Sequence, residues 1–113
     1  PFVVDARRCL AFHTIENREE ELPENIRAAL GPWVAGCDIC QDVCPWNHRS
    51  LPQSNDPDMQ PRPWLLNLHK EEIQTWDDSV WEQKLRGSAL RRIKPWMWRR
   101  NAAAAQPHPT PTL

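Results

Sequence analysis

The sequence predicts a mainly α-helical fold, and three observations support this class. Apolar residues recur at helical spacing in short segments, several of which are ended by proline or glycine. No strand pattern is longer than Phe2–Val4. Twelve prolines divide the 113 residues into short stretches. A chain of this length forms one small domain and buries only about two thirds of its surface, so a stabilising metal or a partner domain is expected.

The amino-terminal half is expected to hold three short helices, over residues 7–12, 24–30 and 38–44. Asp5 is a suitable N-cap for the first helix, and Pro23 occupies a favoured first position for the second. Pro45 ends the third helix because proline lacks the N–H group that a helix needs. Residues 14–21 are acidic and too polar to bury, so a loop is expected there.

The second half is expected to begin with a proline-rich connector over residues 51–63. Asp78 or Ser79 is a candidate cap for one helix beyond it, and Ser88 for the last. Pro95 either kinks that last helix or starts a new one that runs to about residue 105. The tail, residues 106–113, alternates proline with polar residues and is expected to be disordered. The predicted helices are 64–68, 71–76, 79–85 and 88–93, with a continuation or a new helix from Pro95 to about residue 105. Together they form a small basic lobe over residues 64–105.

Charge is distributed unevenly along the chain. Residues 1–83 carry a net charge of −8, whereas residues 84–113 carry +7 and no acidic residue. A basic end of this kind indicates either an anionic partner such as RNA or a face that meets the acidic part of the chain. Tryptophans interleave with these cations, as on RNA-contacting surfaces, although a helix that packs its tryptophans inward explains the pattern equally well. The candidate nucleic-acid-binding residues are Arg91, Arg92, Lys94, Arg99 and Arg100.

No apolar run is long enough to span a membrane, and the first residues lack the features of a signal peptide. A cytoplasmic protein with no membrane partner is therefore expected.

Four cysteines stand as Cys9 and the run Cys37-x2-Cys40-x3-Cys44-Pro45. Disulfides are disfavoured without an export signal. Zinc is an alternative, with four thiolates or with His48 as one ligand, but zinc folds usually use two separated C-x2-C pairs. The run reproduces the last three members of the bacterial C-x2-C-x2-C-x3-C-P pattern, whose thiolates converge on a [4Fe–4S] cluster. Residues 1–50 are therefore predicted to form a ferredoxin-like (α+β) cluster-binding lobe.

The spacing also indicates how the ligands divide between clusters. In the bacterial pattern the last cysteine of a run binds the other cluster of a pair. Cys9, Cys37 and Cys40 would then bind one cluster and Cys44 a second, so this lobe is expected to be half of a two-cluster module. Trp33 and Trp46 flank the run and are candidates to shield it from water. His13 and His48 are expected on the surface.

Several motifs together resemble the carboxyl-terminal portion of the epoxyqueuosine reductase family. The resemblance runs from about Val4 to Ala104, and the block Gly36-Cys-Asp-Ile-Cys-Gln-Asp-Val-Cys-Pro-Trp-Asn47 is its most specific part. Asp5-Ala-Arg-Arg-Cys9, Gly87-Ser-Ala-Leu-Arg-Arg92 and Arg100-Asn-Ala-Ala103 also match. After Ala104 the chain departs from the family, which puts any RNA contact made by the family's tail in doubt.

The resemblance implies an oxidoreductase that uses two [4Fe–4S] clusters and a cobalamin to convert epoxyqueuosine to queuosine in tRNA. It implies an electron donor such as flavodoxin or ferredoxin, and an upstream catalytic domain that holds the cobalamin and the unknown catalytic residues. Only the cysteine ligands carry over to this chain, namely Cys9, Cys37, Cys40 and Cys44. Two alternatives remain: a ferredoxin-type electron-transfer module of another enzyme, and a structural zinc module that binds RNA.

Overall fold

A computed structural model describes residues 2–49 and 52–107 of the chain. The predicted mainly helical class is confirmed. The β part of the predicted ferredoxin-like lobe is not seen, because the described residues contain no strand. Val3 and Val4 each remain 88% exposed, and no neighbouring segment pairs with their backbone. An extended segment without a neighbouring strand has no ladder of hydrogen bonds to make.

The chain forms eleven short helical elements within the described residues. Five are α-helices, and the other six, named η, are 3₁₀ turns except for the π-helical turn η2. In chain order they are η1 (Ala6–Arg8), η2 (Phe12–Glu16), α1 (Glu24–Ala29), α2 (Ile39–Asp42), η3 (Pro45–His48), η4 (Pro57–Met59), η5 (Pro63–Asn67), α3 (Lys70–Gln74), α4 (Asp78–Leu85), η6 (Ala89–Arg92) and α5 (Pro95–Ala104).

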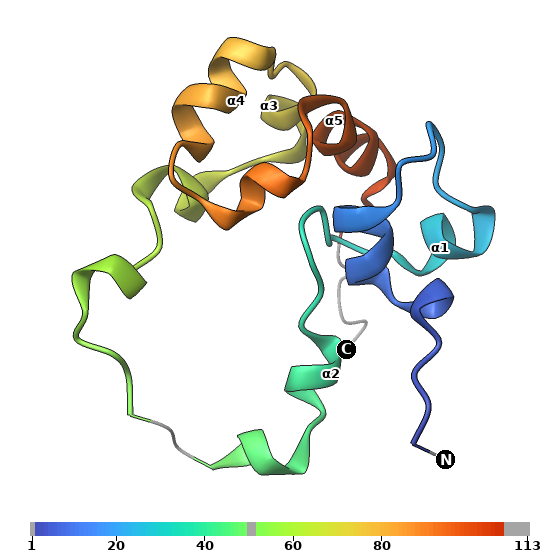
Figure 1. Cartoon of the computed structure of the whole chain (residues 1–113), viewed down its shortest axis with the longest axis vertical. Helices are drawn as coiled ribbons and strands as arrows, with labels where there is room; N and C mark the ends of the chain where they lie inside the picture. The colour runs from blue at the N-terminus through green and yellow to red at the C-terminus, as the bar shows by residue number, and fades with distance from the viewer. Residues whose placement is uncertain (1, 50–51, 108–113) are drawn as a thin grey trace.

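The elements gather around two hydrophobic clusters. Figure 1 shows α3, α4 and α5 together at one end and α1 beside the amino-terminal segment, while α2 lies at the opposite end. The larger cluster fills the space among the carboxyl-terminal helices and contains Trp76, Trp81, Leu85, Ile93, Met97 and Trp98 among its buried residues. The smaller cluster consists of Leu10, Leu22, Ile26 and Leu30. We call them the tryptophan cluster and the leucine cluster.

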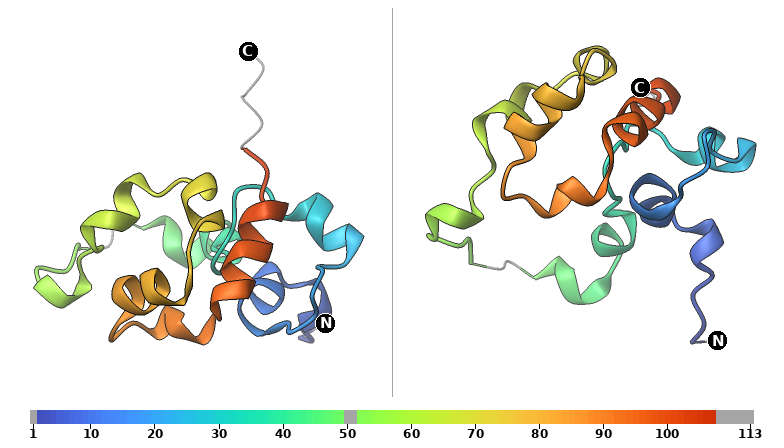
Figure 2. Two further views of the ribbon diagram at one scale, coloured as in Figure 1. Left: turned by 90° about the horizontal axis from the view of Figure 1, so that it is seen from above. Right: turned by 45° about the horizontal axis from the view of Figure 1, so that its top comes forward.

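Helix α5 contacts both clusters. Met97, Trp98 and Ala102 belong to the tryptophan cluster, and Ala104 packs against the leucine cluster. The helix also lies against α3 and η2, and Figure 2 shows it between the other carboxyl-terminal helices and the amino-terminal segment. Lys70 Nζ donates to the carbonyl of Ala105 at 2.8 Å, which places a cation at the carboxyl end of α5. This helix therefore joins the two ends of the chain.

The connector between η3 and η5, residues 49–61, has little contact with the rest of the molecule. All of its described residues are exposed, including those of η4, and Figure 1 shows the connector running along the outside of the molecule. The radius of gyration, 15.5 Å, exceeds the roughly 13 Å of a compact domain of this length. The extended connector accounts for this openness.

Most predicted helix boundaries are confirmed to within two residues. Asp5 accepts a hydrogen bond from the backbone of Arg7, Ser88 caps η6, and Pro95 starts α5 rather than kinking a longer helix. Asp77, and not Asp78 or Ser79, caps α4, because its carboxylate reaches the N–H of Val80 at 2.8 Å. The predicted disorder of the tail falls mainly on residues 108–113, which lie outside the described residues.

The predicted loop over residues 14–21 is wrong at its start. Residues 14–16 belong to η2, and Thr14 is fully buried. His13, expected on the surface, is only 5% exposed. Its ring bonds to the carbonyl of Arg7 and to Asn17, so its polar atoms are satisfied inside the fold. The local sequence is polar, but α5 covers it from a distant part of the chain.

Replacing the fully buried Leu30 by alanine tests the leucine cluster. We expect Leu30→Ala to lower the free energy of unfolding by about 2–5 kcal/mol, because it leaves a cavity among packed side chains. Leu66→Ala is the matched control, because Leu66 is 68% exposed. Denaturant unfolding measures both variants, and equal effects would contradict this description of the core.

An ion pair between η2 and η6 makes stability depend on pH. The guanidinium of Arg92 donates to both carboxylate oxygens of Glu16 and holds the pKa of Glu16 below its ordinary value of 4.5. This contribution is present above the unfolded-state pKa and is lost as the pH falls through the lower folded-state pKa. Glu16→Gln is therefore expected to lower the thermal midpoint at pH 7 and to match the wild type in strong acid. A constant difference at all pH values, or an equal effect of the exposed Glu20→Gln, would contradict the pairing.

Candidate metal centre

The four cysteines occupy the ends of short helical turns. Cys9 directly follows η1 and donates its backbone N–H to the carbonyl of Ala6 at 3.1 Å. Cys37 lies two residues before α2, Cys40 lies within α2, and Cys44 caps η3. All four are free thiols, and only Cys40 is fully exposed. The disfavoured disulfide reading gains no support from this arrangement.

The Cys37–Cys44 segment is folded by its own backbone hydrogen bonds. The carbonyl of Asp38 accepts from Gln41 and Asp42 at 2.9 and 2.8 Å and so starts α2. Pro45 begins η3 and turns the chain away, as the motif predicts. Asn47 Nδ2 then reaches back to the carbonyl and the side-chain oxygen of Gln41, at 3.1 and 3.0 Å. Asn47 thus closes the turn that carries Cys40 and Cys44, a role that the sequence analysis missed.

Apolar residues surround part of this segment. Cys37 and Trp33 pack against the leucine cluster, which includes Leu10, the residue after Cys9. Trp33 and Cys37 thus share one apolar neighbourhood, and the shielding of the run by Trp33 stays a prediction. Trp46 is 78% exposed and packs into neither cluster. Ile39 and Val43 are also exposed, which leaves an apolar surface over α2 and η3.

The donor chemistry fits an iron–sulfur cluster, but the chain does not gather a complete ligand set. Free thiols beside apolar side chains are the ligands that iron–sulfur clusters take. Among the described residues, however, no three side chains of His, Cys, Asp or Glu come together closely enough to hold one metal ion. His48 is exposed and joins no such group, so the structure lends no support to a zinc site that uses it.

A buried polar network lies beside the cysteine segment. The four buried polar residues of the described chain are His13, Thr14, Asn17 and Asn101, and all four contribute to it. Arg100 also belongs to it, since its guanidinium donates to the backbone carbonyls of residues 13, 17 and 19. Burial lowers the pKa of Arg100, with a smaller contribution from Arg18. This network was not predictable from the local sequence, because its partners lie up to 87 residues apart.

Each predicted RNA-binding residue has a partner within the chain. Two form ion pairs, Arg91 with Glu82 at 2.6 Å and Arg92 with Glu16. The Nζ of Lys94 lies 5.9 Å from the centre of the Trp81 ring. Arg99 donates to the carbonyl of Trp76 at 2.7 Å, and Arg100 belongs to the buried network. The acidic and basic parts of the chain therefore meet each other. Trp98 is buried, as expected for a helix that packs its tryptophans inward, whereas Trp96 is 37% exposed.

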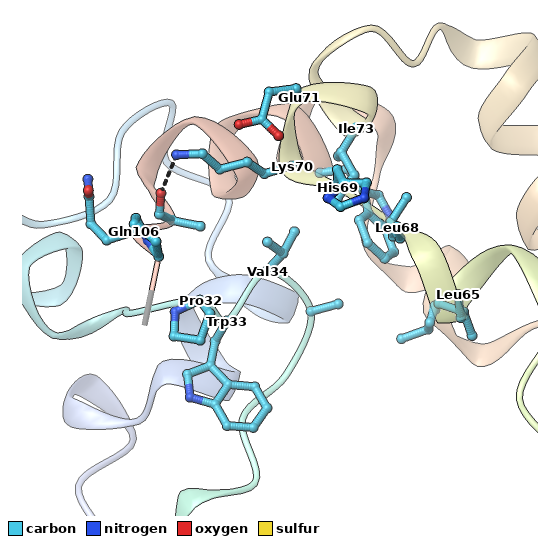
Figure 3. A pocket seen from close by; sticks show the side chains of 15 residues that line it. Pro32, Trp33, Val34, Leu65, Leu68, His69, Lys70, Glu71, Ile73 and Gln106 are labelled. Carbon is cyan, nitrogen blue, oxygen red and sulfur yellow. Dashed lines mark hydrogen bonds between the residues drawn. The ribbon is translucent and has the colours of Figure 1, made fainter. Parts of the chain in front are cut away.

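A pocket of about 840 Å³ opens beside the loop that leads to Cys37. Figure 3 shows Trp33 and Val34 on one side of it and Leu65 and Leu68 on the other. None of the four cysteines lines the pocket, so it is separate from the candidate metal centre. No helix in the described part of the chain has the length and apolar character that a membrane crossing requires.

The chain matches known proteins over all of its length. Residues 1–47 match the family model described as a 4Fe-4S double cluster binding domain. The whole chain aligns at 96% identity with a protein named epoxyqueuosine reductase from Synechococcus sp. strain CC9605, and the alignment covers 35% of that protein. It is 57% identical over 101 residues to the protein of that name from Prochlorococcus marinus strain NATL2A, and 41% identical over 105 residues to the one from Salmonella typhimurium. These alignments cover 89% and 93% of the chain and 32% and 27% of those proteins.

No solved structure matches the chain. The chain spans about a third of the length of the curated relatives that it matches. The resemblance that the motifs indicated is confirmed over the full 113 residues. The chain is therefore similar over its whole length to part of proteins named epoxyqueuosine reductase.

Proposed function

We propose that this chain is the cluster-binding part of an oxidoreductase that converts epoxyqueuosine to queuosine in tRNA. The observation that carries the proposal is the coincidence of two matches in one segment. Residues 1–47 match a double 4Fe-4S domain, and the same residues lie within the 96% identity to a protein named epoxyqueuosine reductase. The free thiols of Cys9, Cys37, Cys40 and Cys44 supply suitable donors.

In this proposal the ligands are divided between two clusters, and residues 1–50 form half of the two-cluster module. Cys9, Cys37 and Cys40 hold one cluster together with a cysteine from outside the chain, and Cys44 completes the other. The division follows the bacterial pattern, in which the last cysteine of a run binds the other cluster of the pair. Among the described residues Cys9, Cys37 and Cys40 do not come together as a group of three, so these thiols must move closer to one another when they bind one cluster. When bound, the clusters supply single electrons for the reduction. The exposed Val3 and Val4 would join a ferredoxin-like sheet only with strands from the rest of the protein.

Cobalamin, the catalytic residues and the binding site for an electron donor such as flavodoxin or ferredoxin are assigned to the rest of the protein. A tRNA substrate and reduced thiols favour a cytoplasmic location.

For tRNA contact we propose Arg92 and Lys94 first, because both side chains are exposed. Arg91, Arg99 and Arg100 are half-buried and serve mainly to hold the fold together.

Anaerobic reconstitution of the full-length protein with iron and sulfide tests the ligand assignment. We expect about eight iron atoms per chain for two clusters, with a broad charge-transfer absorption that dithionite bleaches. Cys37→Ser and Cys44→Ser should each lose about half of the iron, because each removes a ligand of a different cluster. His48→Ala is the control and should keep all of it.

Two results would reject the proposal. A colourless protein with stoichiometric zinc would make the chain a structural zinc module. Full iron content in both cysteine variants would show that these thiols are not cluster ligands.

A further inference from the structure

We infer that Thr14 and Asn101 are positioning residues for Cys37, which they fix through the backbone of residues 34–36. This inference rests on the proposed function, since it assigns Cys37 as a cluster ligand. Neither residue carries a thiol or contacts the cluster in the proposal. Their role is to hold the loop before Cys37 in one place.

The first contact is a hydrogen bond next to Cys37. The backbone N–H of Gly36 donates to Thr14 Oγ1 at 3.0 Å. Gly36 has a φ of +81°, a conformation that side chains with a Cβ rarely adopt. A Cβ at this position would meet only Ile15 Cδ1 at 3.9 Å, so the backbone conformation and not lack of space requires the glycine. The left-handed turn at Gly36 fixes the direction in which the chain enters Cys37.

Thr14 is itself held in place to accept this bond. Its hydroxyl donates to the carbonyl of Leu10 at 3.0 Å, so an oxygen lone pair is left for Gly36. Thr14 is fully buried and lies in the π-helical turn η2. Turns of this kind are rare and occur often at functional sites. A side chain without the hydroxyl would leave the Gly36 N–H without this partner inside the fold, which is costly.

Asn101 joins Thr14 to the other end of the same loop. Its side-chain amide donates to the carbonyl of Thr14 at 2.9 Å and to the carbonyl of Val34 at 2.8 Å. Its oxygen accepts from Arg100 Nε at 3.1 Å, and Arg100 in turn binds the carbonyl of His13. Asn101 is fully buried, so both N–H groups of its amide must be satisfied by these carbonyls.

The two side chains therefore fix the loop at both ends. Val34 is bound by Asn101, Gly36 is bound by Thr14, and Cys37 follows directly. Residues that orient a metal ligand in this way typically change metal affinity by about 10- to 100-fold when they are replaced. Cys40 and Cys44 lie beyond this network, because Asn47 and Asp38 hold their turn. The effect is specific to the cluster that Cys37 binds.

The test compares three variants of the reconstituted full-length protein without oxygen. Thr14→Val removes the hydroxyl and keeps the shape, whereas Thr14→Ser keeps the hydroxyl. Leu85→Val is the control for general destabilisation, because Leu85 is fully buried in α4 and takes no part in the network. The readouts are the rate of iron loss to a chelator, the electron paramagnetic resonance spectrum of the reduced clusters and the thermal midpoint.

We expect Thr14→Val to release the iron of one cluster about 10-fold faster than the wild type and to change the signal of that cluster. Thr14→Ser should behave as the wild type. Leu85→Val should lower the thermal midpoint but leave the rate of iron loss and the spectrum of the reduced clusters unchanged. The inference would be overturned if Thr14→Val kept the wild-type rate of iron loss and the wild-type spectrum. It would also be overturned if Thr14→Ser were as defective as Thr14→Val, or if Leu85→Val lost iron as fast as Thr14→Val.

Two further results separate the possible failures. If the wild type takes up no cluster, the proposed function fails and the inference falls with it. If Thr14→Val does not fold, amide hydrogen exchange of wild-type Gly36 decides, because the bond to Thr14 predicts slow exchange and an unprotected amide would overturn the inference.

Discussion

The fold depends on hydrogen bonds from two adjacent residues of α5 to the backbone of the amino-terminal segment. Arg100 and Asn101 donate to the carbonyls of residues 13, 14, 17, 19 and 34. Residues 13 and 14 lie in η2 and the other three in irregular segments, and a buried carbonyl left unpaired would be costly. Because Trp98 and Ala102 of the same helix are in the tryptophan cluster, α5 links a packed core to a segment with little core of its own.

This arrangement explains how a chain with so little regular structure places its cysteines. The leucine cluster is small, and α2 lies away from both clusters (Figure 1). Cys37 lies near packed residues, whereas Cys40 and the apolar side chains of Val43 and Trp46 are exposed. The exposure of these side chains is what we expect if residues 1–50 form half of a two-cluster module, as proposed.

Local signals in the sequence were sufficient for the features that neighbouring residues determine. The C-x2-C-x3-C-P run predicted the turn from Cys37 to Pro45, and the serine and proline at positions 88 and 95 predicted where η6 and α5 begin. The burial of Thr14 was not predictable in this way, because the residue that covers it is 87 positions away. The sequence left open whether the basic end binds an anionic partner or meets the acidic part of the chain, because partners such as Arg92 and Glu16 lie 76 positions apart. The missing β structure has a similar cause, since a strand requires a neighbour to pair with.

The central claim is that α5 holds two separate amino-terminal segments at once. Amide hydrogen exchange of Asn101→Ala, compared with the wild type, tests this claim most directly. We expect faster exchange both in residues 13–17 and in residues 34–36, with α4 unchanged, because one amide binds both segments. Faster exchange confined to α5 itself would contradict it, since the two segments would then be held without the helix.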